Sequence, residues 1–125
     1  MTYLLSLPNA TVEAILSGRQ SLLGLWSVSW RSPALKWHAG DTLLLRKKRS
    51  KIIGKAEIKK IILFDHPGAE ELVVIKRCWQ KAMDVPDVFF QDRVRERYFS
   101  ILFLENPEQF LFPQAWTYSF PVRVE

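Results

Sequence analysis

The sequence contains a single cysteine, Cys78, and this scarcity excludes several kinds of site. One cysteine cannot form an intramolecular disulfide, and it excludes zinc sites built from several cysteines. The same scarcity fits a reducing compartment, so we expect the protein to be cytoplasmic. Cys78 falls in a helical pattern beside Trp79, and we predict that it is a buried thiol.

Long apolar runs and common catalytic motifs are also missing. No stretch reaches about 18 apolar residues, so no membrane-spanning helix and no membrane partner are expected. The first ten residues show no basic region followed by a long apolar run, so no signal peptide is expected. There is no Gly-rich phosphate loop, HExxH motif or nucleophile elbow, and His38 and His66 have no evident acidic partner. We therefore predict no metal site and no cofactor.

The charge that is present is concentrated in one segment. The 125 residues are 48% hydrophobic and 25% charged, which is typical of one globular domain spanning residues 1–125. The net charge is +5, but residues 46–60 alone hold eight basic residues and one acid. That segment is +7, so the other 110 residues sum to −2. A basic stripe on a near-neutral body is typical of a surface that binds a polyanion.

Periodicity predicts a mostly β, α+β fold. Tyr3–Leu7 has the pattern of a short strand stopped by Pro8, and the apolar spacing of Thr11–Ser17 predicts a helix with Asn9 as its N-cap and Gly18 as its stop. Together the patterns predict a curved mixed sheet or open barrel with an early helix and a helical insertion before the closing strands. The further predicted elements are strands within 20–30, 42–46 and 51–64, a helix over 70–82, a weaker helix over 87–97, a strand over 98–104 ended by Asn106-Pro107, and an extended edge-like tail over 110–124.

Short motifs along the chain carry a family resemblance. They are Leu5-Ser6-Leu7, Gly18-Arg19-Gln20-Ser21, Gly40-Asp41 before a strand, and Ile52-Ile53-Gly54-Lys55-Ala56. In this order they resemble an ASCH domain of the PUA-like superfamily, which is related to EVE and YTH-like domains. The resemblance implies a mixed β-pseudo-barrel that binds RNA or modified nucleobases. Some small ASCH proteins are amidohydrolases that act on N4-acetylcytidine, and this activity is the alternative that the resemblance implies.

The sequence departs from the enzymatic pattern of that family. The family motif Gly-x-Lys-Thr is matched by Gly18-Arg19-Gln20-Ser21, so Gln20 stands at the position of the catalytic lysine. An amide cannot act as a general base or as a nucleophilic amine. The family's Glu-x-Arg pair falls near Leu23 and Leu25. The resemblance therefore favours a binding domain over an amidohydrolase.

The first candidate site is a basic hairpin. Its residues are Arg46, Lys47, Lys48, Arg49 and Lys51. Each cation can contact a phosphate and release condensed counterions, so nucleic acid, with RNA favoured, is the expected partner. The alternative is a charged strand edge that prevents edge-to-edge aggregation. The run holds no aromatic residue, so contacts to bases have to come from elsewhere in the chain.

The second candidate site is a pocket for a base or modified base. Such a pocket needs a flat aromatic face and polar groups for the base edge. The alternation of the strand places Trp26, Val28 and Trp30 on one face and the serines between them on the other. Packing of the tryptophans in the core therefore remains the alternative. The candidate pocket residues are Arg19, Gln20, Trp26, Ser27, Ser29, Trp30, Arg31 and Trp37.

Two further interpretations stay open. Arg93, Arg95 and Arg97 either extend the phosphate-binding track or form a solvated helix end. The aromatic tail over 110–120 either docks on a protein partner or forms part of the barrel. The sequence predicts no oligomeric state.

Overall fold

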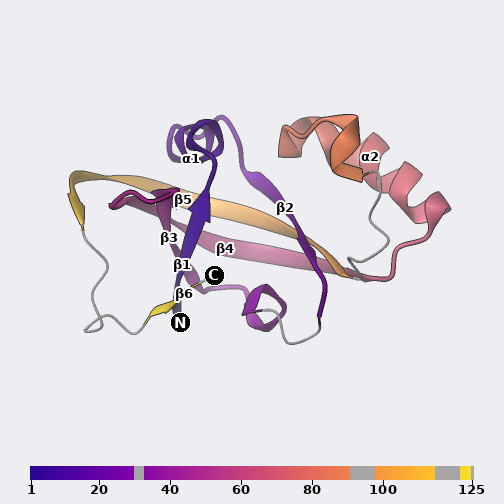
Figure 1. The fold of residues 1–125 in the computed structure, drawn as a ribbon, viewed down its shortest axis with the longest axis horizontal. Coiled ribbons are helices and arrows are strands. Elements are labelled where there is room, and N and C mark those ends of the chain that lie inside the picture. Colours follow the sequence, from indigo (N-terminus) through magenta and orange to yellow (C-terminus); the bar gives the residue numbers. More distant parts are fainter. Residues whose placement is uncertain (30–32, 91–97, 115–121, 125) are drawn as a thin grey trace.

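The computed structural model describes residues 1–29, 33–90, 98–114 and 122–124 (Figure 1). The elements follow the predicted order of an early helix, a set of strands, a helical insertion and closing strands. They are β1 (Thr2–Leu7), α1 (Asn9–Leu16), β2 (Leu22–Ser27), the 3₁₀ helix η1 (Pro33–Lys36), β3 (Thr42–Lys47), β4 (Ile52–Asp65), α2 (Ala69–Met83), the 3₁₀ helix η2 (Asp87–Phe90), β5 (Tyr98–Gln114) and β6 (Val122–Val124).

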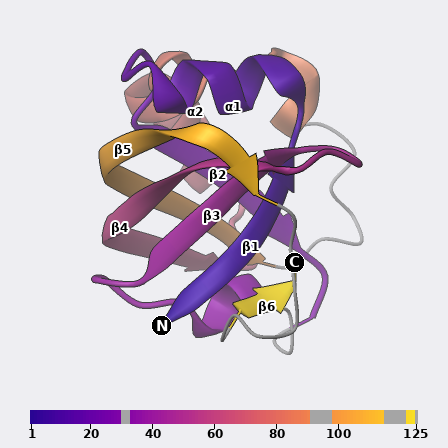
Figure 2. The same cartoon turned by 90° about the vertical axis from the view of Figure 1, so that its left-hand side faces the viewer.

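The six strands of the described residues form one curved sheet. Their order is β2-β5-β4-β3-β1-β6. β1 runs parallel to β3 and β6, whereas the other neighbouring pairs are antiparallel. Figure 2 shows the sheet curling beneath α1 and α2, while η1 lies at the opposite end. The prediction of a mostly β, mixed pseudo-barrel with a helical insertion is confirmed.

The N-cap of helix α1 lies one residue before the predicted cap, Asn9. Pro8 occupies the N-cap position with an extended backbone, and its carbonyl accepts a hydrogen bond from the Val12 N–H at 3.1 Å. Asn9 is already inside the helix, so the prediction that it caps the helix is wrong. Gly18 adopts the left-handed conformation at φ 81°, as expected for a residue that ends a helix.

Helix α2 packs one face against the sheet. Ile75 and Met83 are buried and Trp79 is half-buried, and the spacing of four residues places these three side chains on one face. Cys78 lies off that face and is exposed, so the prediction of a buried thiol is wrong. No helix among the described residues is long and apolar enough to cross a membrane.

Strand β5 continues past the point where the sequence predicts its end. Asn106 takes a left-handed backbone conformation at φ 51°, but the strand runs through Asn106 and Pro107 to Gln114. The pairing with β4 shifts register between Lys55 and Glu57, which pair with Glu108 and Glu105, and this shift accommodates Asn106-Pro107 within the strand. The prediction that Asn106-Pro107 ends the strand is therefore wrong.

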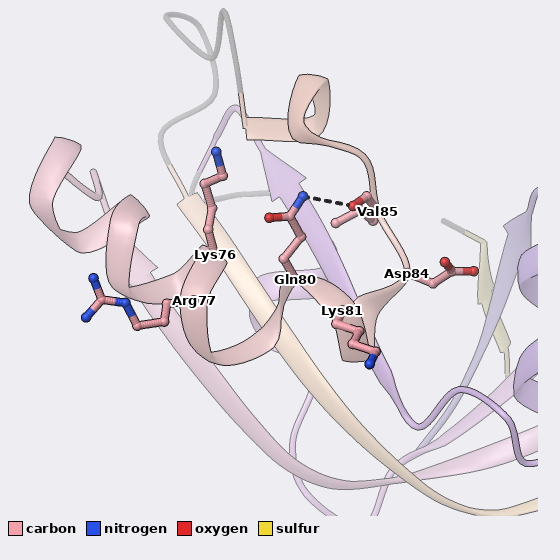
Figure 3. Close-up of a pocket in the computed structure, with 6 residues that line it drawn as sticks. All are labelled: Lys76, Arg77, Gln80, Lys81, Asp84 and Val85. Carbon is pink, nitrogen blue, oxygen red and sulfur yellow. Dashed lines mark hydrogen bonds between the residues drawn. The ribbon is translucent and has the colours of Figure 1, made fainter.

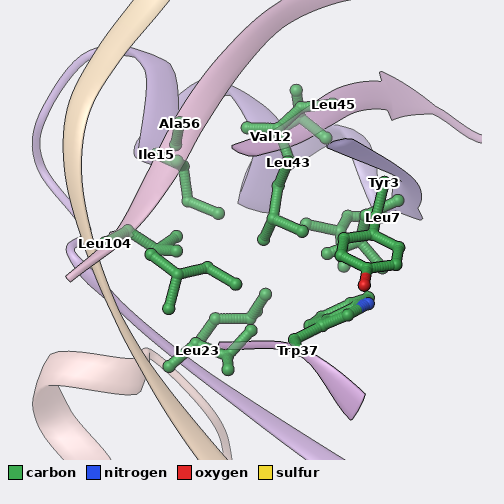
Figure 4. Close-up of a cluster of buried hydrophobic side chains, with 13 residues drawn as sticks. Tyr3, Leu7, Val12, Ile15, Leu23, Trp37, Leu43, Leu45, Ala56 and Leu104 are labelled. Carbon is green, nitrogen blue, oxygen red and sulfur yellow. The ribbon is translucent and has the colours of Figure 1, made fainter. Parts of the chain in front are cut away.

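Two clusters of buried side chains form the core. The first lies beneath α1, where Trp37 packs against Tyr3 with ring centroids 5.5 Å apart (Figure 4). The second surrounds the fully buried Phe99, between the sheet and α2. The cavity described below lies between the two helices that cover these clusters. The buried members of the first cluster are Tyr3, Leu5, Leu7, Val12, Ile15, Leu23, Trp37, Leu43, Leu45, Ala56, Ile58, Leu102 and Leu104.

Candidate functional site

The turn between β3 and β4 presents three exposed cations. A hydrogen bond from the Ser50 N–H to the Lys47 carbonyl closes this turn at 3.0 Å. Lys48, Arg49 and Lys51 are exposed, and within the described part of the chain they have no hydrogen-bond or ion-pair partner. We call these three residues the hairpin cations. Their charges are available to a ligand because no carboxylate of the described residues neutralises them.

The other two residues of the predicted basic hairpin are engaged within the protein. Arg46 is half-buried, and its Nε donates to Ser6 Oγ at 2.6 Å. Lys47 Nζ lies 2.7 Å from Glu13 Oε1, and this hydrogen bond and the lysine charge lower the pKa of Glu13. Arg46 and Lys47 therefore tie the base of the hairpin to β1 and α1.

A cavity of about 290 Å³ lies between the start of α1, strand β2 and the segment that follows α2. Its walls are mainly apolar, with polar groups from Thr11, Gln20 and Asp84. Among the described lining residues, Asp84 alone has an ionisable side chain. The full lining is Leu7, Pro8, Thr11, Gln20, Leu23, Gly24, Leu25, Met83, Asp84, Val85, Pro86 and Phe89.

Gln20 is the predicted pocket residue that lines this cavity. Its side chain is buried, with 5% of the residue exposed. The Nε2 group donates to the Leu22 carbonyl at 2.9 Å and to the Met83 carbonyl at 3.1 Å. The amide thus joins the start of β2 to the end of α2 and holds two walls of the cavity together.

The cavity and the base of the hairpin are linked through the end of β1. Leu7 lines the cavity and is also the register partner of Lys47 in the parallel pair of β1 and β3. The Lys47–Glu13 pair attaches the same end of the hairpin to α1. The fold therefore places the hairpin cations and the cavity on the same end of β1.

Arg19 and Trp26 lie outside the described lining of the cavity. Arg19 is exposed, and its Nε donates to Ser17 Oγ at 3.0 Å. Trp26 is half-buried, donates its Nε1–H to the Phe89 carbonyl at 3.1 Å, and packs on Phe99 with ring centroids 4.7 Å apart. Trp26 therefore packs as a member of the second core cluster.

The remaining predicted pocket residues are dispersed. Ser27 is buried and Ser29 is exposed. Trp37 is 4% exposed in the first core cluster, so it presents no open face for a base. The tryptophans were expected either to line a base-binding pocket or to pack in the core, and Trp26 and Trp37 pack in the core. Trp30 and Arg31 lie outside the described residues, as do Arg93, Arg95 and Arg97.

Sequence reasoning missed a groove on α2 of about 360 Å³ (Figure 3). Gln80 stands in its middle, with Lys76 and Arg77 to one side and Lys81 to the other. Lys76 is partly engaged, since its Nζ lies 3.7 Å from Asp87 Oδ1. The four-residue spacing of Arg77 and Lys81 was the available signal. The groove shares Asp84 and Val85 with the cavity, so the two are neighbours.

No cluster of three or more histidine, cysteine, aspartate or glutamate side chains suited to a metal occurs in the ranges that the structure describes. The described residues combine exposed cations at the hairpin with an almost uncharged cavity. This combination can attract a phosphate backbone and enclose a flat, uncharged group.

Solved structures share this arrangement of elements. ASCH from Zymomonas mobilis is 14% identical, with a TM-score of 0.67 over 99% of this chain and 98% of that chain. A variant of ZmASCH gives a TM-score of 0.71 at 14% identity, over 91% of this chain and 73% of that chain. The hypothetical protein PH0355 gives 0.59 at 14% identity, over 88% of this chain and 100% of that chain. No protein-family model matches the chain, and no curated protein matches it either. The strand order, the inserted helix and these likenesses together show that the chain has the ASCH-domain fold.

Proposed function

We propose that this protein binds nucleic acid through the hairpin cations and holds a base or modified base in the adjacent cavity. The observation that carries the proposal is the group of three exposed cations, Lys48, Arg49 and Lys51, without partners among the described residues. RNA is the favoured nucleic acid because the family resemblance implies it.

The hairpin cations suit a phosphate backbone. A lysine or arginine that contacts a phosphate releases condensed counterions, and binding then weakens as salt is added. For a single strand the slope of log K against log salt is about −0.7 for each phosphate contact. The neighbouring Lys47 is already paired with Glu13, so we assign it to holding the hairpin in place.

The cavity suits a small flat group. Its volume of about 290 Å³ is near the lower end of the range for ligand pockets, which begins at about 300 Å³. Apolar walls can cover the faces of a base, while Thr11 and the free oxygen side of the Gln20 amide can meet its polar edge. The cavity thus complements the hairpin, which holds no aromatic residue.

The amidohydrolase alternative receives less support from the cavity. The Gln20 amide nitrogen is committed to two backbone carbonyls, and an amide supplies neither a base nor a nucleophile. Asp84 is the one ionisable group in the described lining, and it lies at the edge that the cavity shares with the α2 groove. We therefore place binding ahead of hydrolysis.

A salt titration with a short single-stranded RNA tests the proposal. The variant Lys48→Ala/Lys51→Ala removes two hairpin cations and leaves Arg49 unchanged, because Arg49 has φ 59° and a substitution there alters the turn as well. The charge-matched control is Lys36→Ala/Lys59→Ala, at two exposed lysines outside the hairpin and the cavity.

The hairpin variant should bind more weakly and lose about 1.4 from the magnitude of the salt slope, while the control keeps the slope of the wild type. Absence of binding at about 50 mM salt would exclude the proposal. Equal slopes for the hairpin variant and the control would exclude the hairpin as the binding surface.

A further inference from the structure

Strand β5 forms a bulge of four residues beside the hairpin. Gly54 pairs with Gln109 and Ile52 pairs with Gln114, so the single residue Ile53 faces the four residues 110–113. The bulge therefore lies next to the first residues of β4, directly after Lys51. Figures 1 and 2 both show the end of β5 close to the β3–β4 turn.

The bulge exposes two large apolar side chains to solvent. Leu111 is 86% exposed and Phe112 is 74% exposed, which makes them the two most exposed of the large apolar side chains described. The neighbouring Phe110 is half-buried and does not share this exposure. An exposed aromatic ring in a bulge contributes little to folding, because it buries little apolar area.

We propose that Phe112 is a stacking platform for a base of single-stranded nucleic acid whose backbone is held by the hairpin cations. This inference rests on the proposed function, and it adds a second base contact outside the cavity. Every base has a flat face, so stacking on an aromatic ring is tolerant of sequence and contributes substantially to single-strand binding. A duplex keeps its bases stacked on one another and cannot offer that face.

Charge complementarity selects nucleic acid as the occupant of this surface. Lys48, Arg49 and Lys51 lie at the same end of the sheet as Phe112 and leave uncompensated positive charge there. A polyanion with flat apolar groups matches both features at once. The basic run itself holds no aromatic residue, and Phe112 supplies the ring from a strand that is distant in sequence.

The test compares three single variants against a ten-nucleotide single-stranded RNA and a duplex of the same length. Phe112→Ala removes the ring, Phe112→Trp keeps an aromatic face and adds a fluorophore, and Leu111→Ala is the matched control for an exposed apolar side chain in the same bulge. Affinities are measured across a salt series, and thermal unfolding checks that each variant folds.

Phe112→Ala should weaken single-strand binding by about fivefold to 100-fold, with the salt slope of the wild type, because stacking releases no counterions. Phe112→Trp should restore binding, and the single strand should quench its tryptophan fluorescence more than that of the wild type, which already has five tryptophans. Leu111→Ala should bind like the wild type.

Two results would overturn the inference. One is an unchanged affinity in Phe112→Ala while Lys48→Ala/Lys51→Ala weakens binding, which leaves the proposed function standing. The other is an equal loss on the duplex and the single strand. If the wild type binds neither RNA, the proposed function fails together with the platform, and exposed Phe112 then has to be tested as a protein contact.

Discussion

Replacing Gln20 with glutamate tests the junction that holds the cavity together. Gln20 Nε2 donates to the carbonyls of Leu22 and Met83, and its side chain is almost completely buried. Glutamate has nearly the same shape, but its carboxylate has no hydrogen to donate. It would therefore place a negative charge against two carbonyl oxygens in a site shielded from water.

The structure sets the size of the effect. Burial beside two acceptors raises the pKa of the introduced carboxyl above its usual range. When protonated, that carboxyl can still donate one hydrogen bond, so the loss in free energy of unfolding at pH 5 is about 1 kcal/mol. Because the folded-state pKa is raised, the stability kept at low pH is lost as the pH rises, and the loss at pH 8 reaches about 4 kcal/mol. Gln20→Met has similar length and no charge, so it should lose about 2 kcal/mol at both pH values.

Urea unfolding followed by tryptophan fluorescence measures both variants at pH 5 and pH 8. The decisive quantity is the difference between Gln20→Glu and Gln20→Met, because the pH dependence of the rest of the protein cancels in it. Gln20→Glu should be the more stable variant at pH 5 and the less stable one at pH 8. A constant difference across this range would show that the side chain reaches water, and the bridging role of Gln20 would then be refuted.

Three further changes should alter stability in ways that urea unfolding can measure. Gly54→Ala places a Cβ 2.5 Å from Leu16 Cδ2 and 2.6 Å from the Glu108 carbonyl oxygen, and it should cost about 1–3 kcal/mol, whereas an unchanged urea midpoint would show that both α1 and β5 move to make room. Trp37→Ala empties the centre of the first core cluster and should cost about 3–5 kcal/mol, and a loss under about 1 kcal/mol would contradict its placement in that cluster. Burial opposes ionisation of Asp41, but the His38 N–H and the N-terminal ammonium outweigh it and hold the pKa of Asp41 below its usual value. A lowered pKa of Asp41 stabilises the fold above about pH 4 and stabilises it less below that pH. The difference in free energy of unfolding between the wild type and Asp41→Asn should therefore shrink as the pH falls through that value. A difference that is independent of pH would argue against the interaction.

Local patterns predicted the elements well because their physical causes are local. A short apolar segment stopped by Pro8 marked β1, and the left-handed preference of glycine placed the end of α1 at Gly18. Glycine inside a strand pattern is typical of a bulge or a close approach, and at Gly54 the β4 register breaks and a Cβ would meet Leu16. Pattern and tertiary structure agree in these places.

The errors arise where a distant partner decides the outcome. Asn106-Pro107 has the local character of a strand end, but β4 shifts its register and lets β5 continue. The exposure of Cys78 depends on how α2 is rotated about its own axis against the sheet. The periodicity of the apolar residues indicates this rotation only roughly.

The candidate site was predictable in composition but not in arrangement. The sequence identifies the basic run, yet only the fold shows that Lys47 pairs with Glu13, 34 positions away in sequence, while Lys48 is free of any partner among the described residues. The same holds for Gln20, whose carbonyl partner at Met83 is 63 positions distant. Such pairs are set by topology, which no local pattern encodes.

The parallel pairing of β1 with both β3 and β6 has a consequence for the order of folding. Thr2 pairs with Val122, so nearly the whole described chain lies between the two strands. During synthesis the outer edge of β1 has to wait unpaired until β6 leaves the ribosome, and closing so long a loop is slow. An unpaired edge is also a template for pairing with another chain. The short β6 is thus the last strand to join the sheet. A nascent chain that stalls before β6 emerges keeps the outer edge of β1 unpaired and is the species most prone to aggregate.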